Sequence, residues 1–223
     1  MSKQKIIILI IAITLIVIGL IFVVKFKKTT PAVSNNEQSA AQVSPIDATD
    51  HVFGDPKAAV QMIVYSDFEC PFCAKFAETM KKVEENFKDK IVITFRQYPL
   101  PIHPQAEKAA EASECAAEQG KFWEMHDRLF ANNIASNMNV EQYKKDAVDL
   151  SLNQEQFNQC LDSGKYAEKV SQQKTDGTKA GATGTPTIFV NGNIYPGAYP
   201  FEDFISPDGQ NNKGMKSIIS ELL

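Results

Sequence analysis

Apolar residues are unevenly distributed along this chain, and the longest run lies near its start. Ile6 to Val24 is a stretch of 19 residues, nearly all Ile, Leu and Val, without a charge. As a helix it would span roughly 28 Å, close to the hydrocarbon core of a bilayer. A cleaved signal peptide is the alternative, but its apolar region is shorter and ends at a small-residue site. We therefore expect residues 1–28 to form an uncleaved, single-pass transmembrane helix of the signal-anchor type.

The next segment has the opposite character. Residues 29–50, "TTPAVSNNEQSAAQVSPIDATD", are rich in Ser, Ala, Asn, Gln and Pro, with a single Ile. Such a composition cannot bury enough apolar surface to fold and is typical of a flexible linker. The folded domain is therefore expected over residues 51–223.

Within this domain, the apolar pattern first predicts a strand, a helix and a second strand. Val60 to Phe68 is apolar and β-branched, as expected for a buried strand, and Ile91 to Tyr98 repeats this pattern. Between them, Pro71 to Asp89 has apolar residues at helical spacings of three and four. A strand, helix and strand within about 40 residues form a βαβ unit with parallel strands.

The rest of the chain predicts several helices and then a hairpin. Helical patterns run through residues 103–180, and Thr187 to Tyr195 contains two short strands around the turn Asn191-Gly192-Asn193. An amphipathic helix is expected over Lys213 to Leu223. The order βαβ, helices, ββα favours one α/β domain with a helical insertion over two successive domains.

The charge distribution argues against nucleic acid as a partner. The net charge is −4, but residues 1–28 carry five lysines and no acid, which leaves 18 basic and 27 acidic residues, a net of −9, in the remainder. Binding to phosphate groups requires clustered Lys and Arg. Lysines flank the apolar run on both sides, so they do not determine its orientation in a membrane.

The candidate chemistry lies in Cys70-Pro-Phe-Cys73, two of the four cysteines of the chain. A structural zinc site needs four ligands, usually two close pairs, whereas the other cysteines and the three histidines are scattered. A structural disulfide across four residues would stabilise the fold very little. Neither a zinc site nor a structural disulfide therefore accounts well for this spacing.

A redox-active pair fits the local pattern better. Cys70 follows a predicted strand and stands where a helix begins, and Pro71 suits the first helical turn. Unpaired N–H groups and the helix dipole stabilise a thiolate at this position. Cys70 is therefore expected to attack, and Cys73, one turn into the helix, to resolve mixed disulfides. We therefore expect the pKa of Cys70 to be lowered. Because Phe72 cannot donate a hydrogen bond to the thiolate, the lowering should be smaller than with a histidine at that position.

Longer motifs resemble those of a known family. "YSDFECPFCAKF", "YPLPIHPQAEKAAEASECAAEQGKFWEMHDRLF", "FNQCLDSGKYAEKV" and "GTPTIFVNGNIYPGAYPFEDF" together resemble the DsbA-like thiol–disulfide oxidoreductases, which have a thioredoxin-like fold. From spacing alone, the peptide bond before Pro186 would be trans. The resemblance implies instead that it is cis, that Pro186 faces the Cys70–Cys73 pair, and that Thr185 pairs with an extended substrate. It also implies that residues 103–180 are an insertion over the active site.

One position departs from the family pattern. Many relatives have a buried acid six residues before the first cysteine that helps to transfer a proton, but this chain has Val64 there. Asp67 and Glu69 are closer to the motif and are expected to be solvated turn residues. Water is then left to serve as the proton carrier for the second cysteine.

The remaining cysteines, Cys115 and Cys160, lie on helical patterns within the proposed insertion. They could be free core cysteines, but a bridge between them would close a loop of about 46 residues, worth roughly 4 kcal/mol. We favour a structural disulfide. Because it would persist only in an oxidising compartment, it places the N-terminus in the cytoplasm and the domain outside the membrane.

Other aromatic and titratable residues are expected to have structural roles. His103 and His126 are interpreted as helix-end or packing histidines rather than catalytic bases. Trp123, Phe122 and Phe130 are expected in the core. Tyr195 and Tyr199, after the hairpin turn, are candidates for the peptide groove, although a packing role is favoured.

The sequence thus predicts a membrane-anchored extracytoplasmic thiol:disulfide oxidoreductase that introduces disulfides into exported proteins through Cys70 and Cys73. It is expected to act as a monomer on reduced exported polypeptides, without metal or organic cofactor, and to be reoxidised by a quinone-linked membrane partner. A disulfide isomerase or reductase on the same fold is the nearest alternative. A peptide-binding chaperone with incidental thiols, and a thiol pair for one dedicated client or for metal delivery, remain open.

Overall fold

The computed structural model describes residues 43–223. The predicted transmembrane helix and the linker up to residue 42 lie outside these residues. None of the helices between residues 43 and 223 is long and apolar enough to cross a membrane.

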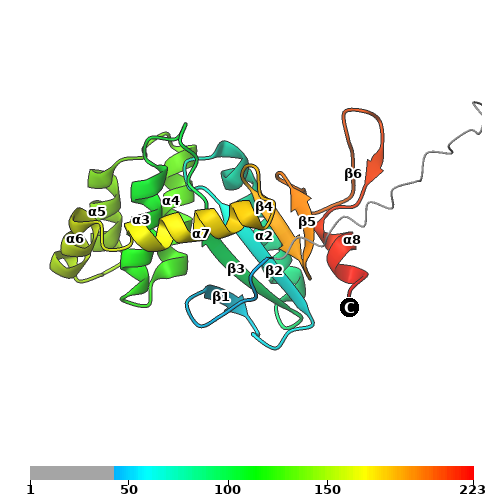
Figure 1. Ribbon diagram of the computed structural model, residues 1–223, viewed down its shortest axis with the longest axis horizontal. Helices are drawn as coiled ribbons and strands as arrows, with labels where there is room; N and C mark the ends of the chain where they lie inside the picture. Colours follow the sequence, from blue (N-terminus) through cyan, green and yellow to red (C-terminus); the bar gives the residue numbers. More distant parts are fainter. Residues whose placement is uncertain (1–42) are drawn as a thin grey trace, which may run out of the picture. The chain divides into compact units, whose positions relative to one another are not determined.

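A five-stranded sheet in the order β1-β3-β2-β4-β5 forms the centre of the domain (Figure 1). β2 and β3 are parallel, and the other neighbours are antiparallel. The predicted βαβ unit and hairpin are therefore confirmed, with β1 added at the edge beside β3. The strands are β1 (His51–Gly54), β2 (Val60–Ser66), β3 (Ile91–Gln97), β4 (Thr187–Val190) and β5 (Asn193–Pro196).

The helices follow the predicted order, with an insertion of five helices between β3 and β4. A second, two-stranded sheet, β6 (Phe204–Ile205) with β7 (Asn211–Asn212), was not expected, and the last helix is shorter than predicted. The helices are α2 (Pro71–Phe87), α3 (Ala106–Ala117), α4 (Phe122–Ile134), α5 (Val140–Asp149), α6 (Gln154–Ser163), α7 (Ala167–Lys179) and α8 (Met215–Ser220).

Alternation along β2 explains why both faces of the sheet are covered. Val60, Met62 and Val64 pack into one core with side chains of α2 and α8, whereas Ile63 and Tyr65 belong to a core on the opposite face. Such alternation is the period-2 pattern of a strand buried on both sides. α2, which begins with the Cys70 motif, is thereby fixed against the sheet along its length.

α7 crosses the face opposite α2 (Figure 1), and Gly177 permits its close approach. A Cβ at Gly177 would lie 2.6 Å from the Tyr65 ring and 3.0 Å from that of Tyr98. Glycine in a helix interior costs about 1 kcal/mol relative to alanine, but any larger side chain here would push α7 off the sheet.

Residues 43–50, assigned from the sequence to the flexible linker, belong to the folded domain. Arg96 of β3 donates to the Asp50 carboxylate at 2.9 and 2.7 Å and to the backbone oxygens of Ser44 and Pro45 at 2.8 and 2.9 Å. Ile46 packs on the core around Tyr65. The predicted linker boundary is therefore too late.

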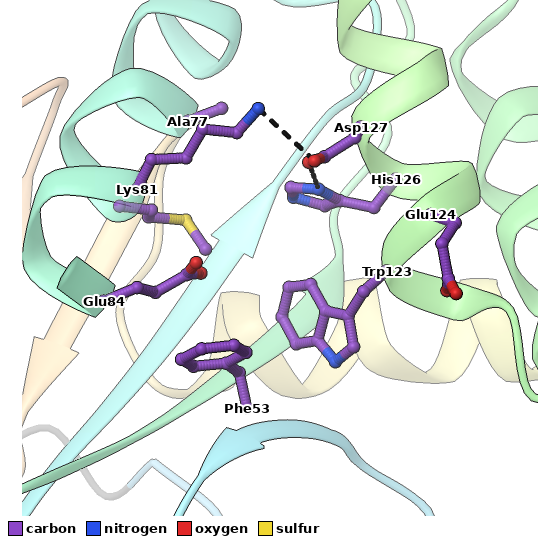
Figure 2. A pocket seen from close by; sticks show the side chains of 9 residues that line it. Phe53, Ala77, Lys81, Glu84, Trp123, Glu124, His126 and Asp127 are labelled. Atoms are coloured by element: carbon purple, nitrogen blue, oxygen red, sulfur yellow. Dashed lines mark hydrogen bonds and ion pairs between the residues drawn. The ribbon is translucent and has the colours of Figure 1, made fainter. Parts of the chain in front are cut away.

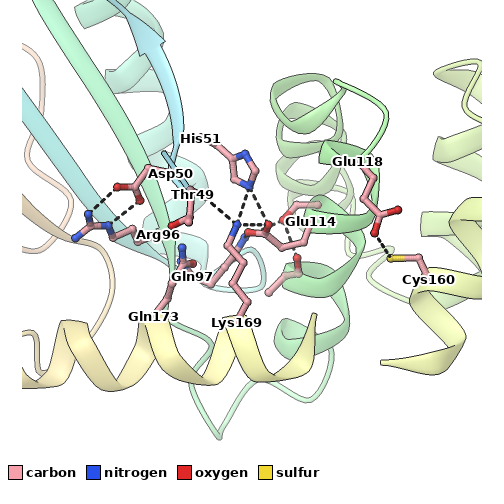
Figure 3. A network of polar contacts seen from close by, with 12 residues as sticks. Thr49, Asp50, His51, Arg96, Gln97, Glu114, Glu118, Cys160, Lys169 and Gln173 are labelled. Carbon is pink, nitrogen blue, oxygen red and sulfur yellow. Dashed lines mark hydrogen bonds and ion pairs between the residues drawn. The ribbon is translucent and has the colours of Figure 1, made fainter. Parts of the chain in front are cut away.

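A second polar network lies beside this one (Figure 3). The Glu114 carboxylate of α3, 1% exposed, accepts from Lys169 of α7 at 2.6 Å and contacts His51 Nε2 at 2.8 Å. Lys169 also donates to the backbone oxygen of Thr49 at 3.1 Å. This buried cluster ties the start of the domain to the helical insertion.

Candidate active site

The Cys70–Cys73 pair stands where the chain leaves β2 and enters α2. Cys70 is the N-cap residue with extended backbone, and Pro71 occupies the first turn. The Cys70 carbonyl accepts from the N–H groups of Cys73 and Ala74, both at 3.1 Å. Both thiols are free, and the two residues are 3% and 1% exposed. Because both are buried, the contrast between the attacking and the resolving cysteine does not lie in exposure.

The contrast lies in acidity. The pKa of Cys70 is lowered to about 6, chiefly because the Cys73 thiol donates a hydrogen bond to its sulfur; burial opposes this, and Thr185 and the backbone N–H groups of Cys73 and Phe72 assist. Burial and the neighbouring Cys70 raise the pKa of Cys73 well above its ordinary value. The expected lowering of the Cys70 pKa is confirmed. One sulfur is a thiolate at neutral pH and its neighbour remains protonated.

The loop before β4 lies against this pair. The Thr185–Pro186 bond is cis, so the trans bond expected from spacing is wrong and the resemblance gave the better expectation. The Cys70 thiol lies 3.5 Å from the Thr185 carbonyl oxygen. Segments 115 positions apart thus meet at the redox sulfur.

Asp67 is not the solvated turn residue that the sequence suggested. It is 2% exposed, and its carboxylate accepts from the N–H groups of Glu69 and Leu100, each at 2.8 Å, and contacts His103 Nδ1 at 2.7 Å. Glu69 in turn accepts from the Gln105 N–H at 2.5 Å. Together they hold the turn before Cys70 against residues 100–105.

Val64 offers no proton acceptor. It is fully buried beneath α2 in an apolar core. The polar side chain that hydrogen-bonds Cys73 is Ser66, at the end of β2 and 3% exposed. As expected, position 64 has no equivalent of the buried acid found in many relatives.

Cys115 and Cys160 are joined by a disulfide with a Cα–Cα distance of 5.9 Å. The bond links α3 to α6 within the insertion. Both half-cystines are buried among apolar side chains of the core that also contains Cys70 and Cys73. The disulfide therefore lies in the same core as the redox pair.

The residues assigned to packing lie in cores. Phe122 and Phe130 are each 4% exposed, and Trp123 is half-buried. His126, 3% exposed, stands among five aromatic rings, with its Nδ1 3.0 Å from Asp127. The rings of Tyr195 and Tyr199 pack edge to face with each other, and both side chains lie against the core beneath α2 and α8.

Comparisons with known proteins agree with this architecture. Residues 47–206 match a family model described as thioredoxin. A Na(+)/H(+) antiporter NhaA 1 of Mycolicibacterium gilvum is 38% identical over 159 residues, 70% of this chain and 25% of the relative. The chain thus spans about a quarter of the curated relatives that it matches.

Solved structures share the fold. Alpha-DsbA1 of Wolbachia pipientis superposes with a TM-score of 0.64 at 23% identity, covering 82% of this chain and 95% of that one. Oxidised BdbD of Bacillus subtilis gives 0.64 at 21% identity, covering 78% and 92%. The chain therefore belongs to the thioredoxin family, with the fold and helical insertion of its DsbA-like members.

Proposed function

We propose that the chain is a membrane-anchored, extracytoplasmic thiol:disulfide oxidoreductase that introduces disulfides into exported polypeptides. The observation that carries this proposal is the pairing of Cys70, whose pKa is lowered to about 6, with a buried Cys73 whose pKa is raised. A thiol of low pKa is a good leaving group and is stable as the thiolate. The reduced pair is then favoured, so the oxidised pair donates its disulfide readily.

The exchange proceeds in two displacements. A substrate thiolate attacks the Cys70 sulfur of the oxidised pair, the Cys70–Cys73 bond breaks, and Cys73 departs with the electron pair and takes up a proton. A second substrate thiolate then attacks the substrate sulfur of the mixed disulfide, and Cys70 leaves as a thiolate. The substrate loses two electrons to the pair, which a quinone-linked membrane partner then removes.

The loop before β4 supplies a substrate-positioning surface in this scheme. The Thr185 carbonyl, which lies 3.5 Å from the Cys70 sulfur, and the adjacent backbone are placed to pair with an extended chain whose cysteine approaches Cys70. Unfolded exported polypeptides, which expose their backbone, are the matching substrate class. The catalytic unit acts as a monomer.

The test is oxidation of reduced, unfolded ribonuclease by the oxidised full chain in a non-ionic detergent. Recovery of ribonuclease activity is expected with the natural chain and with Glu85→Gln, an exposed change on α2, and is lost with Cys70→Ser. Cys73→Ala is expected to accumulate mixed disulfides with many exported proteins. A single trapped client would favour a dedicated pathway instead.

Titration of the Cys70–Cys73 pair against glutathione tests the direction of electron flow. An oxidising couple supports disulfide donation, whereas a strongly reducing one would replace it with a reductase or isomerase role. Suppression of aggregation by Cys70→Ser, together with no oxidation by the natural chain, would instead favour a chaperone.

A further inference from the structure

A cavity of about 200 Å³ lies between α2, α4 and β1, away from the loop that carries Pro186. Its apolar wall consists of Phe53, Met80, Ala77 and Trp123. Figure 2 shows the Glu84 carboxyl, the His126 ring and the rings of Trp123 and Phe53 around a common space. Nothing in the redox scheme uses this cavity.

His126 brings an unsatisfied acceptor to the cavity. Its side chain is 4% exposed, and its Nδ1 lies 3.0 Å from an Asp127 carboxylate oxygen. Since a carboxylate only accepts, Nδ1 carries the proton and Nε2 presents its lone pair. Nε2 is buried and finds no partner among the described residues. A buried acceptor without a donor is costly, and it is best satisfied by a group that enters the cavity.

Glu84 brings a second acceptor, half-buried on α2. Of the other charged residues that line the cavity, Asp127 is paired with Lys81 at 3.3 Å, and Glu124 with Lys121 at 2.7 Å. Within residues 43–223, the Glu84 carboxylate has neither an ion-pair nor a hydrogen-bond partner. The lining therefore has an unbalanced negative charge beside an unsatisfied neutral acceptor.

The aromatic wall favours the same kind of ligand. Trp123 is held in place by its N–H, which donates to the Val52 carbonyl at 3.2 Å, and Phe53 packs edge to face with it at 6.3 Å. Aromatic faces attract cations, tryptophan most strongly. Two acceptors, one of them a carboxylate, and two aromatic rings together favour a donor that is positively charged and has a hydrocarbon body.

We propose that this cavity binds a small organic ammonium ion, a primary amine of alkyl or arylalkyl type. Its N–H groups donate to the Glu84 carboxylate and to His126 Nε2, and its hydrocarbon part contacts Trp123, Phe53 and Met80. The ligand would join α2, which carries the redox cysteines, to α4 of the insertion and to β1.

The ionisation of Glu84 sets the conditions for the measurement. Burial raises the pKa of Glu84 to about 7, as do the charges of Asp127 and Glu85, while Lys81 opposes them. The other titratable groups lining the cavity are Glu124 and His126, from α4. At pH 8 Glu84 is ionised, so the test is made there.

Trp123 is the only tryptophan in the chain, so its fluorescence reports directly on the cavity. The full chain in a non-ionic detergent is titrated with benzylammonium chloride, with benzyl alcohol as the neutral control of similar shape. We expect a saturable change with a dissociation constant on the order of 1 mM for benzylammonium. Benzyl alcohol should bind roughly tenfold more weakly.

Paired variants distinguish the effect of a charge on binding from an effect on folding. Glu84→Gln should weaken benzylammonium roughly tenfold, whereas the matched surface change Glu85→Gln should leave it unchanged. Lys81→Met, which removes a competing cation, should tighten binding, whereas Lys82→Met should not. The absence of a saturable change, equal affinity for benzyl alcohol, or indifference to both Glu84→Gln and Lys81→Met would each overturn the proposal.

Discussion

At the scale of single residues, the acidity of Cys70 couples the redox chemistry to stability. Its folded-state pKa of about 6 lies below the ordinary value of 9.0, so the thiolate stabilises the reduced fold. This contribution is fully present above about pH 9 and is lost as the pH falls through about 6. Relative to Cys70→Ser, the free energy of unfolding of the reduced chain should rise over this window by up to about 4 kcal/mol.

Urea unfolding of both reduced chains across the pH window checks this prediction, and the ultraviolet absorbance of the thiolate gives the Cys70 pKa independently. Replacing Cys73 with alanine removes the principal hydrogen-bond donor to Cys70 and should raise that pKa. A stability difference that is constant with pH, or a Cys70 pKa near the ordinary value of 9.0, would contradict it.

Asp67 acts on the fold through the contacts of its buried carboxylate. In Asp67→Asn, one oxygen becomes an amide that cannot accept from the Leu100 N–H or from His103. The expected loss is roughly 2–3 kcal/mol in the free energy of unfolding. Asp149→Asn, an exposed change on α5, should stay within about 0.5 kcal/mol of the natural chain. Equal effects of the two changes in urea unfolding would rule out the anchoring role.

The two residues illustrate what the sequence can and cannot predict about the site. Cys70 and Cys73 are three positions apart, and their helix start is a local feature, so the motif indicates the chemistry directly. Asp67 instead depends on donors 33 and 36 positions away. No local pattern reports such a convergence, and a polar residue in a turn is by default assigned to solvent. The buried, unpartnered Nε2 of His126 is hidden for the same reason.

At the scale of elements, the disulfide between α3 and α6 should brace the insertion. It joins residues 45 positions apart in the sequence. In the chain-entropy account, closing a loop of this length raises the free energy of the unfolded chain by roughly 4 kcal/mol. Cys115→Ala together with Cys160→Ala should lower the free energy of unfolding by about 2–4 kcal/mol. Calorimetry or urea unfolding of the oxidised chain measures the loss.

The redox pair provides the control for this change. Ribonuclease oxidation at a temperature where the double variant remains folded should proceed at the natural rate, because Cys70 and Cys73 lie on α2 and not on the bridged helices. A variant as stable as the natural chain would show that the bridge contributes no bracing.

Long elements with a clear period were predictable, and short ones were not. β2 and β3 are continuous runs of mostly buried residues, and α2 buries residues at helical spacings, so the order and type of these elements follow from the sequence. β1 has only four residues, none fully buried, and it is held by pairing with β3 rather than by its own pattern. The domain begins earlier than composition suggests because Arg96, far along the chain, binds the backbone of residues 44 and 45.

At the scale of the whole molecule, the proposed orientation depends on the cysteines. The lysines on both sides of Ile6–Val24 are uninformative, but a bridge between Cys115 and Cys160 persists only in an oxidising compartment. The pair therefore serves as a reporter of location. When cells are denatured in the presence of a thiol-alkylating reagent, Cys115 and Cys160 should remain unmodified unless a reductant is added first.

Protease treatment gives an independent measurement of the same arrangement. If the chain is anchored with its domain outside, alkaline washing should leave it in the membrane fraction, and protease added to spheroplasts should digest the domain while cytoplasmic proteins stay intact. The Cys115→Ala, Cys160→Ala chain should show no reductant-dependent alkylation at these positions. This control identifies Cys115 and Cys160 as the source of the alkylation signal. Alkylation of Cys115 and Cys160 without reductant, together with protection from protease, would place the domain in the cytoplasm. Disulfide donation to exported proteins would then be impossible, because the glutathione pool there would keep the Cys70–Cys73 pair reduced.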